Sequence, residues 1–266
     1  MYLFDLGKLP GQQSMLIFHA LARMGIEALV IVSPQNPLVS IGYFTNAERE
    51  IDLPYCREAG IPIMRREIGG GVTYLDGNQI FYQLIWKKNN PKVPKTIQDI
   101  YVQFSEAPVE TYRAFGIETE FQPVNDIITK EGKKIAGEGG GDVAECMVFV
   151  GGVLLDFDYE TMSRILRAPD QTFRDRVYKT MRENLTTMKR ELGTTPPRQD
   201  IVAVLKEEFE KRVGKFNQAP MTPEILDKMS QLESWMTSKE FLLKKTPRKP
   251  TGVKIKEGIE VLYEGD

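Results

Sequence analysis

Histidine and cysteine are scarce in this sequence, which holds one histidine and two cysteines among its 266 residues. Disulfide-stabilised domains need several cysteine pairs, and a structural zinc ion takes about four cysteine or histidine ligands, so both are excluded. The single histidine, His19, falls in a stretch with helical periodicity. Every Ser/His/Asp or Cys/His catalytic arrangement would have to use it, and a packing role within the helix is the favoured interpretation.

A strong charge of either sign is also missing. The formal net charge is −2, and the 27% of charged and 41% of hydrophobic residues are typical of a globular protein. No run approaches the ~18 apolar residues of a membrane-spanning helix, and Met1–Asp5 lacks the basic region of a signal peptide. The composition therefore predicts a soluble, cytoplasmic protein without a nucleic-acid or membrane partner.

The two parts of the chain differ in pattern. Up to about residue 157, short β-branched and aromatic runs alternate with turns, and beyond it apolar residues recur every three or four positions, as in helices. This order predicts the α+β class, with a sheet-rich body and a helical C-terminal subregion. We expect strands at 29–32, 38–41, 80–85 and 147–155, helices at 13–24, 96–115 (broken at Pro108) and 173–192, N-caps at Asp158, Asp170 and Thr222, and a hairpin at 252–263.

Three adjacent glycines give the strongest local signal. Gly69, Gly70 and Gly71 follow the Arg65-Arg66 pair between two strand-like runs. Glycine permits positive φ and leaves room for backbone N–H groups to converge on an anion, while arginine adds positive charge and forked donors. The alternative is a surface turn beside a solvated arginine pair, and the segment alone does not separate the two.

A second segment combines a hairpin with a lysine pair. Residues 125–136 read as a strand, a turn and a return strand. In the return strand Lys133 and Lys134 point to opposite faces, so at most one enters a pocket, where it would face an acyl carbonyl or phosphate oxygen. An exposed hairpin is the alternative. We expect the glycine-rich stretch 137–141, ending at Asp142, to form a phosphate-facing or mobile loop.

The order and spacing of these segments resemble those of lipoate–protein ligases, which share a superfamily with octanoyltransferases and biotin–protein ligases. The resemblance is carried by 66–71, by Asn125-Asp126-Ile127, by 132–137 and by Gly151 before an apolar strand. It extends upstream to Val39–Asn46 and downstream to Trp235 and Ser238–Phe241. On this basis residues 1–245 form a ligase-like catalytic domain, and 246–266 form a basic linker with a short hairpin.

The resemblance implies a biotin/lipoate ligase-type fold with mostly antiparallel sheets packed by helices. It implies an ATP-dependent ligase that forms lipoyl-adenylate from lipoate and ATP, with Mg²⁺, and transfers the lipoyl group to a lysine of a lipoyl-domain or H-protein-like acceptor. Lys134 would be catalytic, in contact with the acyl carbonyl and the α-phosphate. The residues implied to bind lipoyl or adenylate are Arg66, Gly69, Gly70, Gly71, Thr73, Asn46, Gly137 and Gly151, and those implied for nucleotide or magnesium are Asn125, Asp126 and Asp142.

Residues 138–142 depart from the family pattern, which leaves Glu138 or Asp142 as further candidates for a magnesium partner. Two alternative functions therefore stay open: an octanoyl or lipoyl transferase that uses an acyl carrier without ATP, and an acyl-binding module that lacks activation. One octanoyltransferase branch carries a cysteine just before the Asn-Asp strand, but 120–124 contains none. Cys146 is expected in the core, and Cys56 is given no role.

The tail departs as well, because related two-domain ligases continue into an accessory domain. Full activity is therefore expected to need a separate accessory-domain polypeptide. Six basic residues between 244 and 256 are interpreted as a solvated linker or, alternatively, as a docking strip for an acidic lipoyl domain. They are Lys244, Lys245, Arg248, Lys249, Lys254 and Lys256.

Overall fold

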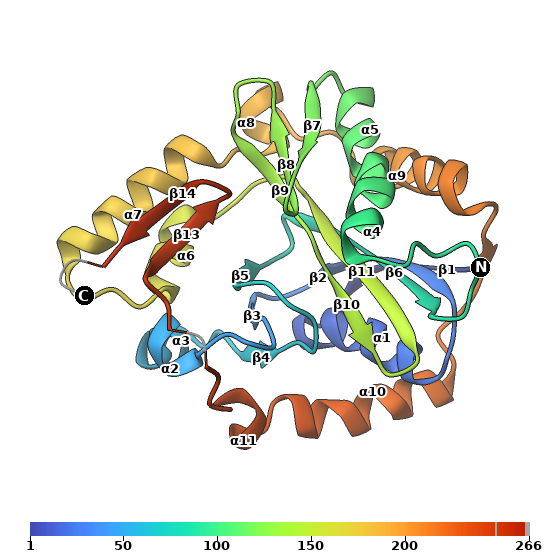
Figure 1. The fold of residues 1–266 in the computed structure, drawn as a ribbon, viewed down its shortest axis with the longest axis horizontal. Helices are drawn as coiled ribbons and strands as arrows, with labels where there is room; N and C mark the ends of the chain where they lie inside the picture. Colours follow the sequence, from blue (N-terminus) through green and yellow to red (C-terminus); the bar gives the residue numbers. More distant parts are fainter. Residues whose placement is uncertain (248, 264–266) are drawn as a thin grey trace.

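A six-stranded mixed sheet forms the centre of the molecule (Figure 1). The computed structural model describes residues 1–247 and 249–263, so Arg248 of the basic stretch lies outside the described residues. In spatial order the strands are β10 (Gly139–Val143), β11 (Cys146–Leu154), β6 (Gln79–Lys87), β2 (Ala28–Pro34), β1 (Tyr2–Leu9) and β12 (Asn217–Gln218). The β2–β6, β6–β11 and β10–β11 pairs are antiparallel, whereas β1 pairs parallel with β2 and β12.

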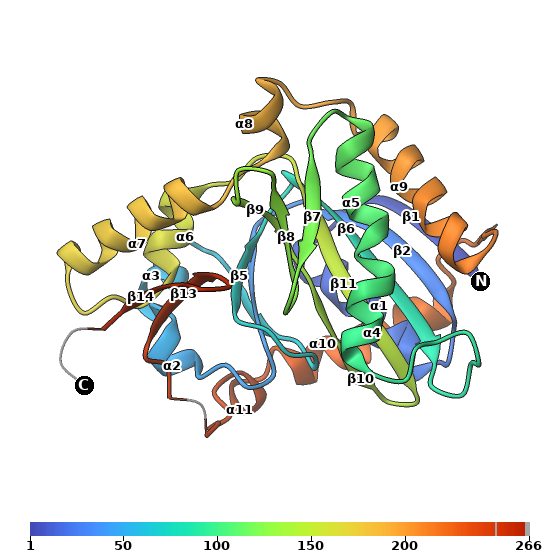
Figure 2. The ribbon, with the colours of Figure 1, turned by 45° about the horizontal axis from the view of Figure 1, so that its top comes forward.

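Helices cover both faces of this sheet (Figure 2). Because successive side chains of a strand point to opposite faces, Leu29 and Ile31 of β2 join one hydrophobic cluster, and Val30 and Val32 join the other. The first cluster is closed by α4 (Ile97–Phe104), α5 (Glu106–Ala114) and α9 (Arg198–Val213), and the second by α1 (Gly11–Arg23) and α10 (Pro223–Met236).

Three smaller sheets surround the central one. They consist of β4 (Ile63–Arg65), β3 (Leu38–Ile41) and β5 (Val72–Leu75); of β7 (Thr119–Gln122), β8 (Asp126–Thr129) and β9 (Lys134–Gly137); and of the hairpin β13 (Gly252–Lys256) and β14 (Ile259–Leu262). The remaining helices are α2 (Ala47–Glu50), α3 (Leu53–Glu58), α6 (Tyr159–Ile165), α7 (Gln171–Asn184), α8 (Met188–Leu192) and α11 (Lys239–Leu242). A third hydrophobic cluster joins β3, α6, α7 and the terminal hairpin.

The α+β class is confirmed, and most predicted elements form at or near their expected bounds. The predicted strand 38–41 coincides with β3. The side chains of Asp158, Asp170 and Thr222 accept hydrogen bonds from backbone N–H groups three residues ahead, so these three N-caps are confirmed. The terminal hairpin also forms as predicted.

Three local predictions were wrong. The helical region 96–115 breaks at Ser105 rather than at Pro108, which lies in the first turn of α5, where a missing N–H costs no intrahelical bond. The apolar repeat from 173 to 192 is divided between α7 and α8, because the Thr187 side chain caps a new helix. The stretch 139–143 is not a loop but strand β10, paired with β11.

Within residues 1–247 and 249–263, no helix is long and apolar enough to cross a membrane.

Candidate functional site

The glycine loop between β4 and β5 turns its carbonyl groups into the protein. The carbonyl oxygen of Gly69 accepts hydrogen bonds from Nε and Nη2 of Arg66, at 3.1 and 3.0 Å. That of Gly71 accepts from Arg66 Nη2 and from the Gly42 N–H, both at 3.1 Å. The Thr45 hydroxyl lies 3.4 Å from the Gly70 oxygen. The loop is thus held from beneath through its oxygens.

The amide groups of the same loop are left open. Among the residues that the structure describes, Gly69, Gly70 and Gly71 donate no backbone hydrogen bond. Gly70 is exposed and has a φ of +102°, so the predicted left-handed conformation is confirmed at this position. Consecutive free amides in such a turn form a concave site with partial positive charge. This geometry suits an anion.

Arg66 acts from below the loop. All five of its N–H donors are used, on Gly69, Gly71 and both oxygens of Ser40. Burial lowers the pKa of Arg66 to about 10, so the guanidinium is still charged at neutral pH. It therefore contributes positive charge to the loop, but its forked donors are not available to a ligand.

Arg65 is likewise turned inward. It is fully buried and donates hydrogen bonds to the backbone carbonyl groups of Gly42, Tyr43, Thr45, Phe241 and Leu242. The expectation that this arginine pair offers its donors to a carboxylate or phosphate was therefore wrong. Backbone carbonyls from distant segments take these donors.

His19 fixes the entrance of the loop. Its Nδ1 lies 2.9 Å from the Met15 carbonyl oxygen, and its Nε2 accepts the Glu67 N–H at 3.1 Å. Burial lowers the pKa of His19 to about 3, so the ring is neutral and its proton is on Nδ1. Glu67 is also paired with Arg23 at 2.6 Å. The sequence indicated packing for His19, and this contact with the loop was missed.

A lysine amine lies at the neighbouring edge of the site. Lys134 begins β9, and its Nζ is 2.8 Å from Oδ1 of Asp126 on β8, with side-chain exposures of 24% for the lysine and 3% for the aspartate. A Cβ atom at Gly137 would lie 2.8 Å from Cε and Nζ of Lys134, so a larger residue there would displace the lysine amine. Of the two adjacent lysines, Lys134 is the one brought to this site.

The lysine and the glycine loop meet across one short segment. The Cα–H of Gly137 faces Lys134, and a Cβ at Gly139 would lie 3.9 Å from the Gly69 carbonyl oxygen. Residues 137–139 therefore connect Lys134, which Gly137 contacts, to the glycine loop, which Gly139 approaches.

Three further predicted residues lie on β5, at the start of α2 and on β11. The Thr73 hydroxyl, on β5 just after the loop, donates to the Ser40 carbonyl at 2.9 Å. Asn46 occupies the N-cap position of α2, and its side chain makes no capping hydrogen bond. Gly151 of β11 lies beneath the Tyr82 ring, since a Cβ there would lie less than 3.0 Å from that ring.

Glu138 is buried behind the site rather than directed into it. Its carboxyl oxygens accept hydrogen bonds from the Tyr82 hydroxyl, at 2.8 Å, and from the Ser105 hydroxyl. Burial raises the pKa of Glu138 to about 8. Its expected role as a magnesium partner does not fit this position. The hydroxyl groups that bury it come from β6 and from the start of α5, which are distant in sequence.

The predicted nucleotide residues are only partly brought together. Asn125 is adjacent to Asp126, but its side-chain amide donates to the Glu138 carbonyl oxygen. Both carboxylate oxygens of Asp126 are engaged, one by Lys134 and one by a backbone N–H at 2.9 Å. Asp142 lies at the far end of β10 and pairs with Lys88 at 3.0 Å. Within the described ranges no three carboxylate, histidine or cysteine groups gather as a metal site.

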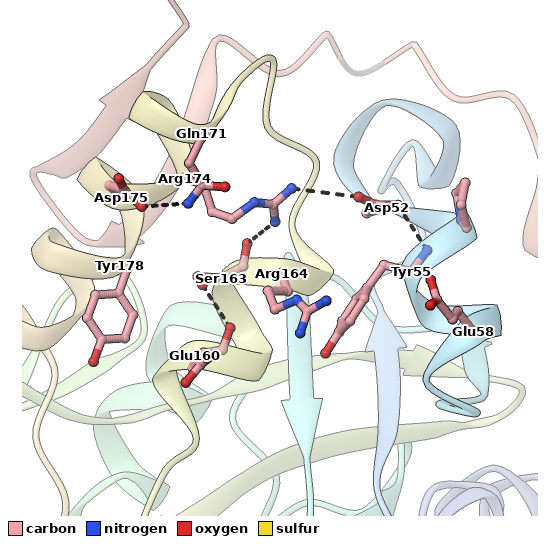
Figure 3. A pocket seen from close by; sticks show the side chains of 11 residues that line it. Asp52, Tyr55, Glu58, Glu160, Ser163, Arg164, Gln171, Arg174, Asp175 and Tyr178 are labelled. Atoms are coloured by element: carbon pink, nitrogen blue, oxygen red, sulfur yellow. Dashed lines mark hydrogen bonds and ion pairs between the residues drawn. The ribbon is translucent and has the colours of Figure 1, made fainter.

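The cysteines and a surface pocket between α3, α6 and α7 lie elsewhere. Cys56 and Cys146 are both buried and unpaired, and burial raises the thiol pKa of each. The pocket is formed by α3, α6 and α7, with Arg164 and Arg174 among several carboxylates (Figure 3). It includes no residue of the glycine loop or of β9. The pocket is thus separate from the glycine loop and Lys134.

Comparison with known proteins identifies one family for this chain. Residues 14–210 match the model of the lipoyl protein ligase A/B catalytic domain. Lipoate-protein ligase A subunit 1 of Thermoplasma acidophilum is 29% identical over 159 residues, which cover 56% of this chain and 59% of that protein. Octanoyltransferase LipM of Kyrpidia tusciae is 24% identical over 231 residues, covering 79% and 84% of the two chains. The first match thus spans less than two thirds of that relative.

Solved structures show the same fold. The bipartite lipoate protein ligase of Thermoplasma acidophilum, studied with its E2 lipoyl domain, aligns with a TM-score of 0.78 at 24% identity, covering 93% of this chain and 98% of that one. A lipoate-protein ligase A bound with ATP aligns with a TM-score of 0.74 at 22% identity, covering 91% and 98%. The expected ligase-type architecture of sheets and helices is confirmed.

The contact between Gly42 and the glycine loop predicts that alanine destabilises the protein more at Gly42 than at Gly69. A Cβ at Gly42 would lie less than 3.0 Å from the carbonyl group of Gly70, whereas one at Gly69 meets nothing within 4 Å. We expect Gly42→Ala to lower the free energy of unfolding by about 1–3 kcal/mol. Gly69→Ala, the matched control, should change it by less than ~0.5 kcal/mol. Equal denaturant midpoints for the two variants would contradict this packing.

The burial of Glu138 predicts a pH-dependent stability. Because its folded-state pKa, about 8, lies above the usual value of 4.5, the folded protein binds the proton more tightly, and stability from this group is lost as the pH rises through that window. Glu138→Gln cannot ionise. We expect its free energy of unfolding to rise relative to the unsubstituted protein between about pH 5 and pH 8, and then to level off. Parallel stability curves in urea would show that Glu138 is not held protonated.

Proposed function

This chain belongs to the lipoyl protein ligase A/B catalytic domain family, and on that premise we propose that it is an ATP-dependent lipoate–protein ligase. It is an enzyme of the lipoate ligase and octanoyltransferase family, whose members similar to this chain include both kinds of enzyme. The proposal concerns the finer choice between them. It rests on the open amides of the glycine loop and on the Lys134 amine, two groups suited to an anion that residues 137–139 connect.

An acyl-adenylate needs a site of this kind. In the first step a carboxylate oxygen of lipoate attacks the α-phosphorus of ATP, the P–O bond to the β-phosphate breaks, and pyrophosphate leaves. The amides of 69–71 and the Lys134 ammonium group would stabilise the charge on the phosphoryl and carbonyl oxygens. In the second step an acceptor lysine amine attacks the acyl carbonyl, AMP leaves with the bonding electrons, and the new amide nitrogen loses a proton.

The cysteines support the ligase over the transferase. An enzyme that takes an acyl group onto its own thiol needs a reactive cysteine, whose pKa is lowered and whose sulfur is accessible. Cys56 and Cys146 are the only cysteines of the sequence, and both are buried with raised pKa values. Neither lies on the loop or on β8 and β9. A transferase working through an enzyme thioester is therefore the less favoured function.

Similar proteins also indicate which kind of protein accepts the lipoyl group. The bipartite ligase with a similar fold was studied with an E2 lipoyl domain, and the similar Thermoplasma protein is named as one subunit. We infer a lipoyl-domain acceptor, and an accessory polypeptide for full activity. Of the basic stretch, Lys244, Lys245, Lys249 and Lys254 are exposed, and the Lys244 amine lies 4.1 Å from the centroid of the Tyr43 ring.

The proposed role of Lys134 predicts that replacing it lowers adenylation activity while the protein stays folded. Lys134→Ala should lower lipoate-dependent exchange of pyrophosphate into ATP by roughly 10²–10³-fold, the usual effect of removing one charge-stabilising donor. Lys133→Ala, its neighbour on the opposite face, is the matched control and should retain exchange within about twofold. Wild-type rates in the Lys134 variant, with loss in the Lys133 variant, would reverse the assignment.

The choice between ligase and transferase is tested by the acyl source. We expect the purified protein, alone or with its accessory polypeptide, to modify a lipoyl domain when given lipoate and ATP, with AMP and pyrophosphate released. Mass spectrometry of the acceptor measures the product. Modification from octanoyl-acyl carrier protein without ATP would favour the transferase, and binding of lipoate without either product would favour a module that lacks activation.

A further inference from the structure

The C-terminal hairpin lies against the lysine of the site. In both ribbon views β13 and β14 run beside α7, with their turn toward the β8–β9 pair (Figures 1 and 2). The backbone N–H of Glu257, in that turn, donates a 2.9 Å hydrogen bond to Oδ2 of Asp126. The other oxygen of the same carboxylate holds Lys134. One side chain thus joins the hairpin to the candidate catalytic amine.

Further contacts fix the hairpin in this place. Nζ of Lys256 donates to the Gly132 carbonyl oxygen, in the turn between β8 and β9, at 2.8 Å. Val253 and Ile255 are buried in the cluster that includes α7, and the rings of Phe173 and Tyr263 are stacked 5.0 Å apart. An isolated two-stranded hairpin is only marginally stable, so its structure depends on this docking.

The hairpin covers the carboxylate and leaves the amine accessible. The Asp126 side chain is 3% exposed and the Lys134 side chain 24%. Both oxygens of the carboxylate are engaged, which holds it in place, and the Lys134 side chain that it binds stays partly exposed.

We propose that the turn of the terminal hairpin is a positioning element of the active site, which orients Lys134 for acyl activation through Asp126. This inference rests on the proposed function for its consequence in catalysis. Glu257 contributes a backbone N–H and Lys256 the anchor that keeps it in place. Neither residue contacts the substrate in this role.

Two lysines of the hairpin allow a matched test. Lys256→Met removes the anchor to Gly132, whereas Lys254→Met removes only a surface ion pair with Glu257, whose partners are 52% and 37% exposed. Such exposed pairs contribute little to stability. Lys256→Arg keeps a donor and serves as the rescue variant. A fourth variant, Gly258→Val, disturbs the turn directly, because a β-branched residue rarely adopts its φ of +77°.

The first readout is pyrophosphate exchange, which does not involve the acceptor protein. We expect Lys256→Met and Gly258→Val to lower kcat by about tenfold or more with little change in the KM for lipoate, as a misplaced catalytic group does. Lys254→Met and Lys256→Arg should stay within about twofold. A higher rate, or a lower KM for ATP, in the Lys256→Met protein would show that the hairpin blocks the site and would overturn the proposal.

The second readout needs no activity. The rate at which Lys134 is acetylated by acetic anhydride, measured by peptide mass spectrometry, should rise in Lys256→Met and Gly258→Val, while the denaturation midpoint of Lys256→Met stays near that of Lys254→Met. Unchanged Lys134 labelling in both variants overturns the positioning role. Absence of exchange in the unsubstituted protein would instead count against the ligase function, so the two failures are distinguishable.

Discussion

The orientation of the peptide groups in the glycine loop depends on the buried guanidinium of Arg66. A peptide group presents either its oxygen or its N–H to a given side, so a cation that binds the oxygens of Gly69 and Gly71 from within turns the amides toward the surface. Burying this charge is compensated by five hydrogen bonds. The full positive charge of Arg66 thus orients the loop N–H groups, each of which carries a partial positive charge.

Close backbone approach is the second condition for this geometry. The loop rests on Gly42, and Lys134 folds over Gly137, at positions where a Cβ would overlap its neighbours. Glycine in these places has a cost in chain entropy, since it loses more conformational freedom on folding than other residues do. That cost is offset where the backbone itself is the binding group. Gly42 and Gly137 therefore belong to the same site as the three glycines of the loop.

Local features of the site could be predicted from the sequence, whereas its long-range contacts could not. Nearby residues were sufficient to predict the bounds of β3, the three helix caps and the positive φ of Gly70. The inward position of Arg66, by contrast, depends on Ser40, and the burial of Glu138 depends on Tyr82 and Ser105. A sequence shows that a charged residue is present but not which distant groups will take its hydrogen bonds.

The sum of charges decides what the site can hold. Asp126 balances Lys134 within one ion pair, and the Glu67 carboxylate is taken up by Arg23. Burial raises the pKa of Glu138 to about 8, so its carboxyl group adds little negative charge behind the site at neutral pH. Arg66 is hydrogen-bonded to carbonyl and hydroxyl oxygens, which carry no full negative charge. A carboxylate or phosphate group is the kind of ligand that open loop amides beside such a cation favour.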